Sequence, residues 1–212
     1  IAVELNSISS VRSINSLKSY VMNLLRSMWI KCSINNAAFV LSPTPEMSKK
    51  IAAKYGRNVI VFKNYLDSSF FDLIIPRSER KKYILSVTSG NYSKNAKSLL
   101  TAFERLMLSR SDLKDYKLVM IGKGLKSLKE YRMNSFKEKI LILENVGHDE
   151  LLERYRYASL YIHPSIEEGF GRPVYEALAC GTTVAVARYL TLQEIHFDER
   201  ILTFDPTDIK QI

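Results

Sequence analysis

Short apolar runs alternate with longer amphipathic stretches from Lys82 to Phe204, and this alternation limits what the chain can fold into. Runs of four or five apolar residues bounded by polar turns predict buried strands, and apolar residues spaced three or four apart predict helices between them. The predicted strands are Tyr83–Val87, Lys117–Ile121, Ile140–Leu143, Leu160–His163, Thr183–Ala187 and Ile201–Phe204. Strands that alternate with helices form a parallel sheet with helices on both faces, so we predict an α/β domain.

The stretches between these strands are the predicted helices. They cover Ala96–Ser109, a segment from Gly124 to about Lys137, Glu150–Ala158 and Pro173–Cys180. Ligands of parallel sheets bind beyond the carboxyl ends of the strands, so the loops at those ends should line one crevice. These loops follow Val87, Ile121, Leu143, His163 and Ala187.

The first part of the chain shows the same alternation over a shorter length. Its predicted elements are a helix over residues 11–32, a strand Ala37–Leu41, a helix Glu46–Tyr55 that stops at Gly56, and a strand Val59–Phe62. An irregular, charged stretch that contains Pro76 follows. We place a domain boundary there and predict two domains, residues 1–75 and 76–212.

The composition is that of a globular protein with an uneven charge. A hydrophobic fraction of 46% and a charged fraction of 25% exclude collagen-like, low-complexity and largely disordered chains. No apolar run approaches the roughly 18 residues that span a membrane, and two cysteines, Cys32 and Cys180, fit a reducing, cytoplasmic compartment. The net charge of +9 is distributed as +5, +7 and −3 over residues 1–75, 76–150 and 151–212. A basic body with an acidic last third favours an anionic ligand and carboxylates at a chemical site.

Two other kinds of site are disfavoured. Only the net charge supports a nucleic-acid partner, because the sequence contains no aromatic–basic recognition motif. His148 and His196 have no metal-ligand spacing with each other or with the cysteines, so we expect no metal site. His163, at the end of a buried strand, is interpreted as a packed, hydrogen-bonded histidine rather than a general base.

The loop after the fourth of these strands combines glycines with two carboxylates. Gly169 and Gly171 allow the backbone to approach a ligand closely, and Pro173 suits the first turn of a helix. The free N–H groups at that helix start favour an anion. Glu176, just inside the helix, can accept two hydrogen bonds from a vicinal diol, and Glu168 stands at the tip of the loop.

Residues 158–194 resemble the signature region of the retaining glycosyltransferases of family 4, which have the GT-B fold and are also described as glycosyl transferases group 1. In that family a strand ending in Pro-Ser is followed by Glu-Gly-Phe-Gly-x-Pro-x-x-Glu, a second apolar strand and a loop with Glu. Residues 164–176, Thr183–Ala187 and Thr191–Ile195 match these pieces. Further segments resemble family elements in the right order: Lys63–Asp67, Lys94 with Asn95, Val119–Gly124 and Asn145–Gly147.

The resemblance implies a Rossmann-like domain that forms the C-terminal half of a GT-B fold and binds a nucleoside-diphosphate sugar. It implies that Glu176 binds the ribose hydroxyls and that Glu168, at the catalytic centre, contacts hydroxyls of the donor sugar. Backbone N–H groups around Gly169, Phe170 and Gly171 would hold sugar or phosphate oxygens. The other implied donor-binding residues are Lys94 at the diphosphate, Val146 beside the base, Gly122 in a Gly-x-Gly turn, and Ser89.

Charge on the leaving diphosphate would be stabilised without a metal. No Asp-x-Asp triplet occurs in the chain, so a metal-chelating donor site is disfavoured, and no cofactor is expected besides the donor substrate. Lys94 and a helix N-terminus can supply the electrostatic stabilisation instead. Ser89 departs from the family pattern, because family members often place an Arg at this position as a second phosphate contact.

The predicted function is transfer of a hexosyl unit, with retention of configuration, to a glycan or lipid-linked acceptor in polysaccharide biosynthesis. The alternative is a non-catalytic nucleotide-sugar-binding module of a glycan-assembly system, which the serine at position 89 favours. Residues 1–75 resemble only the last part of the family's acceptor-side domain, and the family's final helix has no counterpart before Ile212. We therefore expect this chain by itself to be an incomplete catalytic unit.

The helix predicted over residues 11–32 carries an apolar stripe flanked by basic residues. These are Arg12, Lys18, Arg26 and Lys31. The simplest interpretation is a helix packed within its domain. The alternative is peripheral contact with an anionic membrane on its cytoplasmic side, which would suit a lipid-linked acceptor.

Overall fold

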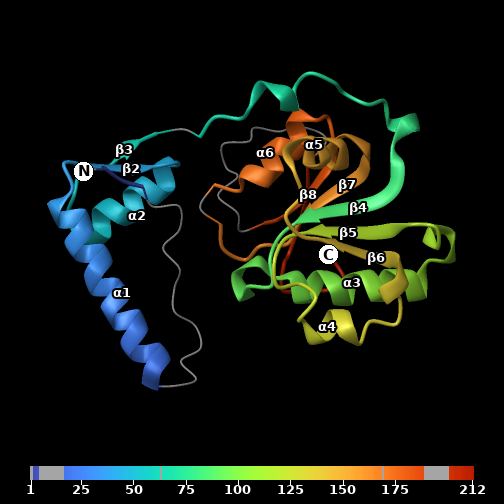
Figure 1. Ribbon diagram of the computed structural model, residues 1–212, viewed down its shortest axis with the longest axis horizontal. Coiled ribbons are helices and arrows are strands. Elements are labelled where there is room, and N and C mark those ends of the chain that lie inside the picture. Colours follow the sequence, from blue (N-terminus) through green and yellow to red (C-terminus); the bar gives the residue numbers. More distant parts are fainter. Residues whose placement is uncertain (1, 5–16, 63, 169, 189–200) are drawn as a thin grey trace. The chain divides into compact units, whose positions relative to one another are not determined.

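The chain forms two compact units. The computed structural model describes residues 2–4, 17–62, 64–168, 170–188 and 201–212 (Figure 1). The first unit comprises Ile1–Tyr65 with Glu168–Phe170, and the second comprises Leu66–Glu167 with Gly171–Ile212. The boundary expected between residues 75 and 76 therefore falls inside the second unit.

The first unit is built on a small parallel sheet with strand order β1-β2-β3. Its elements are β1 (Ala2–Glu4), α1 (Leu17–Asn36), β2 (Phe39–Ser42), α2 (Pro45–Tyr55) and β3 (Ile60–Val61). The hydroxyl of Thr44 accepts the backbone N–H of Met47 at 3.2 Å and so caps α2, and Gly56 ends the helix with φ 65°. Ile34, Val40 and Ile51 are buried between the helices and the sheet. Of the helix predicted over residues 11–32, the first six residues lie outside the described part.

The second unit is a six-stranded parallel sheet with helices on both faces, which confirms the predicted α/β, Rossmann-like fold. Its strands are β4 (Lys81–Val87), β5 (Lys117–Ile121), β6 (Ile140–Leu143), β7 (Ala158–His163), β8 (Val184–Ala187) and β9 (Ile201–Phe204). Its helices are α3 (Ala96–Ser109), α4 (Lys129–Arg132), α5 (His148–Tyr157) and α6 (Arg172–Ala179). Figure 1 shows α3 and α4 on one face of this sheet and α5 and α6 on the other.

Short 3-10 helices fill several connections of the second unit. They are Ser68–Phe70, Arg77–Glu79, Tyr92–Lys94, Ser111–Leu113 and Lys137–Lys139. The first of these matters for packing, because Phe70 is only 1% exposed and belongs to the main core. That core otherwise consists of apolar side chains from the strands and from the inner faces of the helices, where their removal from water stabilises the fold.

One predicted helix is wrong. The segment from Gly124 to about Lys137 forms only the single turn of α4, with irregular chain on either side. Leu125 and Leu128 are buried from turns rather than from a helix face, and the Asn134 side chain donates to the carbonyl oxygen of Leu100 at 3.0 Å. The Oδ1 of Asn134 also accepts the backbone N–H of Phe136 at 2.9 Å, and a local bond of this kind competes with the helical backbone hydrogen bonds.

Among the described residues, no helix combines the length and the apolarity that crossing a membrane requires.

Candidate functional site

The chain changes its direction across the sheet between β4 and β7. From β4 it proceeds outward to β5 and β6, and it then returns to β7, which pairs with β4 on its other side. In open parallel sheets such a switch point leaves a crevice beyond the carboxyl ends of the two central strands. The two loops at this point touch, because the backbone N–H of Ile166 donates to the carbonyl oxygen of Ser93 at 2.8 Å.

The loop between β4 and α3 carries two of the predicted site residues, Ser89 and Lys94, both half-buried. It ends at Asn95, which adopts a left-handed backbone with φ 54° and whose side chain donates to the carbonyl oxygen of Pro206 at 2.9 Å. The hydroxyl of Thr88 donates to the carbonyl oxygen of Lys94 at 3.4 Å. Lys94 is thus fixed through its backbone immediately before α3, whose first N–H groups favour an anion.

The turn after β5 is pressed against the loop after β4. Gly90 donates its N–H to the carbonyl oxygen of Lys123 at 3.0 Å, and a Cβ on Gly90 would lie 2.5 Å from the carbonyl oxygen of Gly124. Gly122 has φ 145°, and a Cβ there would lie 1.6 Å from the carbonyl oxygen of Thr88. The two glycines therefore let the two loops approach more closely than side chains would allow.

Val146 lies in the loop after β6, the third loop on this side of the switch point. The residue before it, Asn145, has a left-handed backbone with φ 57°, and Gly147 after it forms the N-cap of α5. Val146 is half-buried and packs against the main core. The end of β6, where this loop begins, adjoins the turn of Gly122, whose N–H donates to the carbonyl oxygen of Leu143 at 2.9 Å.

Helix α6 begins where the sequence predicts. Gly171 is its N-cap, is buried, and takes φ 74°, a left-handed conformation that favours glycine. Pro173 occupies the first turn, where its missing N–H does no harm. Glu176 follows one turn later, and its side chain is directed by the helix rather than by a loop.

Glu176 is a buried carboxylate with a partner on each oxygen. The residue is only 7% exposed. Its Oε2 accepts a hydrogen bond from the hydroxyl of Tyr155 on α5 at 2.9 Å, and its Oε1 lies 2.9 Å from Nε of Arg172, one helical turn earlier. Burial of a charge is tolerated when it is paired and hydrogen-bonded in this way.

The hydroxyl of Tyr155 keeps its proton at neutral pH. Burial raises the pKa of Tyr155 well above its usual value of 10, and the neighbouring Tyr161 and Glu176 raise it further. The protonated hydroxyl donates to the Glu176 carboxylate.

A second carboxylate, Asp67, is held close to α5. Its Oδ1 accepts hydrogen bonds from the hydroxyl and the backbone N–H of Ser69 at 2.6 and 2.9 Å, and these bonds lower the pKa of Asp67. The charges of His148 and Arg172 lower it further. The hydroxyl of Ser69 lies 2.9 Å from Nε2 of His148 at the start of α5, so the segment around Asp67 is attached to this helix.

The structure brings together most of the predicted donor-binding residues in one unit. Ser89, Lys94, Gly122, Val146, Gly171 and Glu176 all belong to the second unit, on loops at the carboxyl ends of its strands or on α6. Glu168 and Phe170 belong to the first unit. Gly169, Lys63 and Thr191–Ile195 lie outside the described residues.

Sequence reasoning missed Tyr155 and Arg172. Arg172 precedes Glu176 by four residues in a predicted helix, so its ion pair could have been predicted from spacing. Tyr155 is 21 residues away on another helix, and only the fold shows that α5 packs beside α6.

His163 and Cys180 are both buried, and His163 is packed and hydrogen-bonded as predicted. His163 is 1% exposed, and its Nδ1 lies 2.9 Å from the hydroxyl of Tyr161. Cys180 is fully buried, and burial raises its pKa to about 11.

A separate cavity lies on the α3 face of the sheet and is not part of this site. Its volume is about 810 Å³, and its walls include Ile84, Phe103, Leu160 and Leu202. The segment after β9 contributes Ile209, Lys210 and Ile212 to it, whereas the described residues of the loops after β4, β5, β6 and β7 do not line it. Within the described residues, no three His, Cys, Asp or Glu side chains gather as metal ligands would.

The second unit is thus an open parallel α/β domain whose switch point lies between β4 and β7, with a buried, partnered carboxylate on α6. The chain belongs to the family described as glycosyl transferases group 1, which matches residues 70–212.

Similar proteins agree with this assignment. The chain is 27% identical over 184 residues to the O-antigen chain mannosyltransferase RfbU of Salmonella typhimurium, covering 84% of this chain and 50% of that protein. It is 28% identical over 134 residues to O-antigen chain mannosyltransferase B of Escherichia coli, covering 61% of this chain and 34% of that protein. Among solved structures, Alr3699/HepE of Anabaena in complex with UDP and glucose has a TM-score of 0.72 at 15% identity, covering 99% of this chain and 59% of that one. The chain therefore spans half or less of the length of these two curated relatives.

Proposed function

We propose that the chain is the donor-binding part of a retaining glycosyltransferase that needs no metal ion. It would transfer a hexosyl unit from a nucleoside-diphosphate sugar to a glycan or lipid-linked acceptor. The observation that carries this proposal is the buried Glu176, held by Tyr155 and Arg172 beside the switch-point crevice. The names of the two mannosyltransferase relatives favour mannose as the transferred sugar and a surface polysaccharide as the product.

Glu176 would bind the ribose. A carboxylate has about four lone-pair sites, so one hydrogen bond from Tyr155 and one from Arg172 leave acceptors for two hydroxyl groups. A vicinal diol presents two O–H donors at the spacing of the two carboxylate oxygens. The ribose of a nucleotide carries such a diol.

Lys94 would neutralise the diphosphate. It lies directly before α3, so its positive charge and the N-terminus of that helix act on the same anion. Ser89 and Gly122 lie on the two loops that touch beside it, and they would line the diphosphate path. Stabilising the negative charge that develops on the leaving diphosphate is the main electrostatic task of this reaction.

The remaining roles concern the base and the sugar. Val146 would lie beside the base, because its loop is next to the Gly122 turn. Glu168 would contact hydroxyls of the donor sugar at the reacting centre. The backbone N–H groups of Gly169, Phe170 and Gly171 would hold sugar or phosphate oxygens at the entrance to α6.

A peripheral contact with an anionic membrane at the cytoplasmic face would place the enzyme near a lipid-linked acceptor. Helix α1 supports this, because it has two apolar faces. Ile30 and Ile34 pack into the core of the first unit, whereas a wider face is exposed. Its members are Val21, Met22, Leu25, Met28 and Trp29, which are 44%, 59%, 54%, 61% and 75% exposed. Arg26 and Lys31 flank this face, and α1 contains no acidic residue.

A thermal-shift titration of this chain tests the donor site. The ligands are UDP, GDP and ADP together with their mannose and glucose conjugates. We expect one nucleotide series to raise the melting temperature of the wild-type chain, and Glu176→Ala to abolish that shift. Glu153→Ala is the matched control, because it removes an equivalent charge from an exposed position on α5, where Oε1 lies 3.9 Å from Nζ of Lys81. If no nucleotide stabilises a wild-type chain that melts cooperatively, the proposal fails.

A non-catalytic nucleotide-sugar-binding module is the second candidate, and Ser89 favours it. A serine offers a phosphate one hydroxyl, where an arginine would offer a charge and several donors. The two candidates differ in turnover. In a complete protein that includes this chain, release of nucleoside diphosphate from the donor supports the transferase, and tight donor binding without release over hours supports the module.

A further inference from the structure

We propose that Tyr155 is a positioning residue of the donor site, whose buried hydroxyl fixes the Glu176 carboxylate so that its outward lone pairs meet the ribose diol. This proposal rests on the proposed function, because it assigns Tyr155 a role in binding the same nucleotide. Tyr155 itself does not touch the nucleotide. It acts only through Glu176.

The ring of Tyr155 is fixed on all sides. The residue is fully buried, and its ring meets those of Phe70 and Tyr161 at centroid distances of 6.1 and 5.6 Å. Its carbonyl oxygen accepts a hydrogen bond from the hydroxyl of Thr182 at 2.6 Å, just after α6. The hydroxyl of Tyr155 therefore has one well-defined position, and its hydrogen bond restricts the position of the Glu176 carboxylate as well.

The two partners of Glu176 differ in exposure, and this difference assigns them different tasks. The Arg172 side chain is 56% exposed, so water or a ligand can replace it at Oε1. The hydroxyl of Tyr155 is buried, so nothing from solvent replaces it at Oε2. Tyr155 thus holds Oε2 from the buried side, while the partner of Oε1, Arg172, can be exchanged for a ligand.

A merely space-filling role predicts a different outcome. A tyrosine that only filled the core would need a partner for its hydroxyl, and any nearby backbone carbonyl would serve. Tyr83 is an example, since its hydroxyl donates to the carbonyl oxygen of Arg154 on the same helix, at 2.7 Å. Tyr155 instead donates to the ionised carboxylate of a candidate ligand-binding residue, a bond of the stronger, charge-assisted kind.

The test compares Tyr155→Phe with Tyr83→Phe. Each variant keeps the aromatic ring and loses one hydroxyl. The hydroxyl of Tyr83 donates to the backbone of α5, whereas the hydroxyl of Tyr155, a residue of α5, donates to Glu176. Only Tyr155→Phe therefore removes a partner of Glu176. The measurement is the Kd, by calorimetry, of whichever of UDP, GDP or ADP binds the wild-type chain, and of its 2′,3′-dideoxy analogue. We expect Tyr155→Phe to weaken binding of the ribonucleotide by about tenfold. The dideoxy analogue should bind this variant and the wild type equally, and Tyr83→Phe should leave both affinities unchanged.

Each outcome decides between the proposals. If the wild-type chain binds no nucleotide, the proposed function itself fails. If the wild type prefers the ribonucleotide and Tyr155→Phe keeps the full preference, the positioning role is overturned. Equal losses for both nucleotides, or equal losses in the two Phe variants, indicate a packing role only and also overturn it.

A second variant keeps the proposal testable if Tyr155→Phe does not fold. In Glu176→Gln one of the two carboxylate oxygens is replaced by an NH2 group, which donates and no longer accepts, so the side chain cannot accept both hydroxyl groups of a diol. We expect this variant to bind the ribonucleotide and the dideoxy analogue with similar affinity. If Glu176→Gln retains the ribose preference of the wild type, the oriented carboxylate is not what reads the ribose, and the proposal falls.

Discussion

Gly122 leaves room for the carbonyl group of Thr88, and no other residue type could do so at this position. A Cβ on Gly122 would lie 1.6 Å from the Thr88 oxygen, and the glycine backbone has φ 145°. The N–H of Thr88 in turn donates to the carbonyl oxygen of Ile121 at 2.9 Å. The loops after β4 and β5 are thus joined at their bases, so the crevice has a rigid wall on the β5 side.

Gly122→Ala should therefore destabilise the second unit by about 2 kcal/mol or more, because backbone must move and the conformation is strained. The free energy of unfolding in urea measures this. Gly147→Ala is the matched control, since a Cβ there would meet nothing within 4 Å, and its effect should be limited to the loss of a glycine N-cap, about 1 kcal/mol or less. Equal stabilities of the two variants would contradict this account of the loop contact.

The sheet of the second unit was largely predictable from sequence, because its strands are short apolar runs between polar turns. Lys117–Ile121, Ile140–Leu143 and Ile201–Phe204 have the predicted bounds. Strand β1 was not predicted, since its three residues become a strand only by pairing with β2. Helix content was overpredicted after Gly124, where turns bury the leucines.

The candidate site was predictable only where neighbouring residues act together. Gly171, Pro173 and Glu176 form one helix start, which their order in the sequence predicts. The contact between Tyr155 and Glu176 joins two helices, so its existence depends on tertiary packing. Local patterns predict helix starts and turns, whereas such long-range partners follow from the fold.

Lys94→Ala should weaken binding of a nucleoside diphosphate by about tenfold and binding of the corresponding nucleoside much less. The reason is that a lysine directly before α3 acts on phosphate charge and not on the base or ribose. Lys97→Ala is the control, because this lysine is also near the start of α3 but lies 4.0 Å from Glu130, with a side chain 58% exposed. Calorimetric Kd values measure both effects. Equal losses of affinity in the two variants would show that the overall positive charge, and not a specific contact of Lys94 with phosphate, attracts the nucleotide.

Cys180 should resist thiol reagents in the folded chain while Cys32 reacts. Cys32 is exposed and Cys180 is buried, and burial raises the pKa of Cys180 to about 11, so at pH 8 almost none of it is the reactive thiolate. The Cys180 pKa is higher in the folded than in the unfolded chain. Its contribution to stability is therefore complete below the unfolded pKa of about 9 and is lost as the pH rises from there toward 11.

Absorbance titration with a disulfide reagent counts the reactive thiols. We expect one equivalent at pH 8 in the native chain and two in denaturant, with Cys32→Ser leaving none in the native chain. Rapid reaction of Cys180 in the native Cys32→Ser chain would show that its burial is incomplete.

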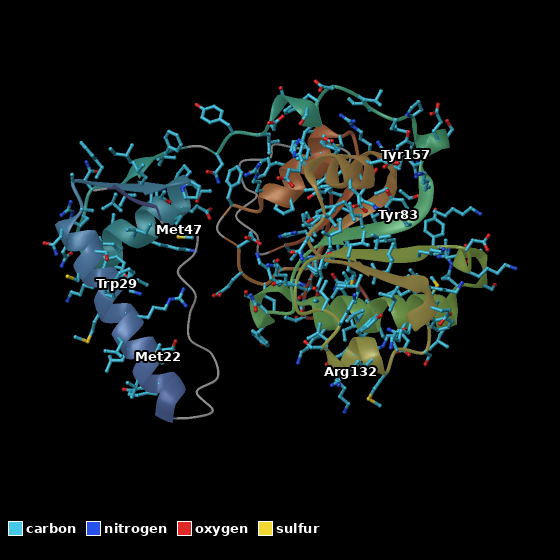
Figure 2. All side chains as sticks on the ribbon, in the orientation of Figure 1. Met22, Trp29, Met47, Tyr83, Arg132 and Tyr157 are labelled. Carbon is cyan, nitrogen blue, oxygen red and sulfur yellow. The ribbon has the colours of Figure 1, made fainter. Side chains whose placement is uncertain are left out.

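The exposed face of α1 should bind anionic vesicles, and the chain carries its own reporter for this. Trp29 is the one tryptophan of the sequence, and it lies on that face with 75% exposure (Figure 2). Insertion of its ring among acyl chains should shift its emission to shorter wavelength when phosphatidylglycerol vesicles are added. Pure phosphatidylcholine vesicles should give a much smaller shift, because Arg26 and Lys31 then have no anionic partner.

Substitutions on this face separate a membrane contact from a general affinity of a basic chain for anions. Met22→Ser with Leu25→Ser should weaken binding to phosphatidylglycerol vesicles by about tenfold or more, since two large apolar side chains lose their burial in lipid. Tyr92→Ser is the control, because it removes an equally exposed apolar group, at 72%, from the second unit. If the double variant sediments with the vesicles as fully as the control, charge alone holds the chain to the surface, and the apolar face of α1 is left for a protein partner.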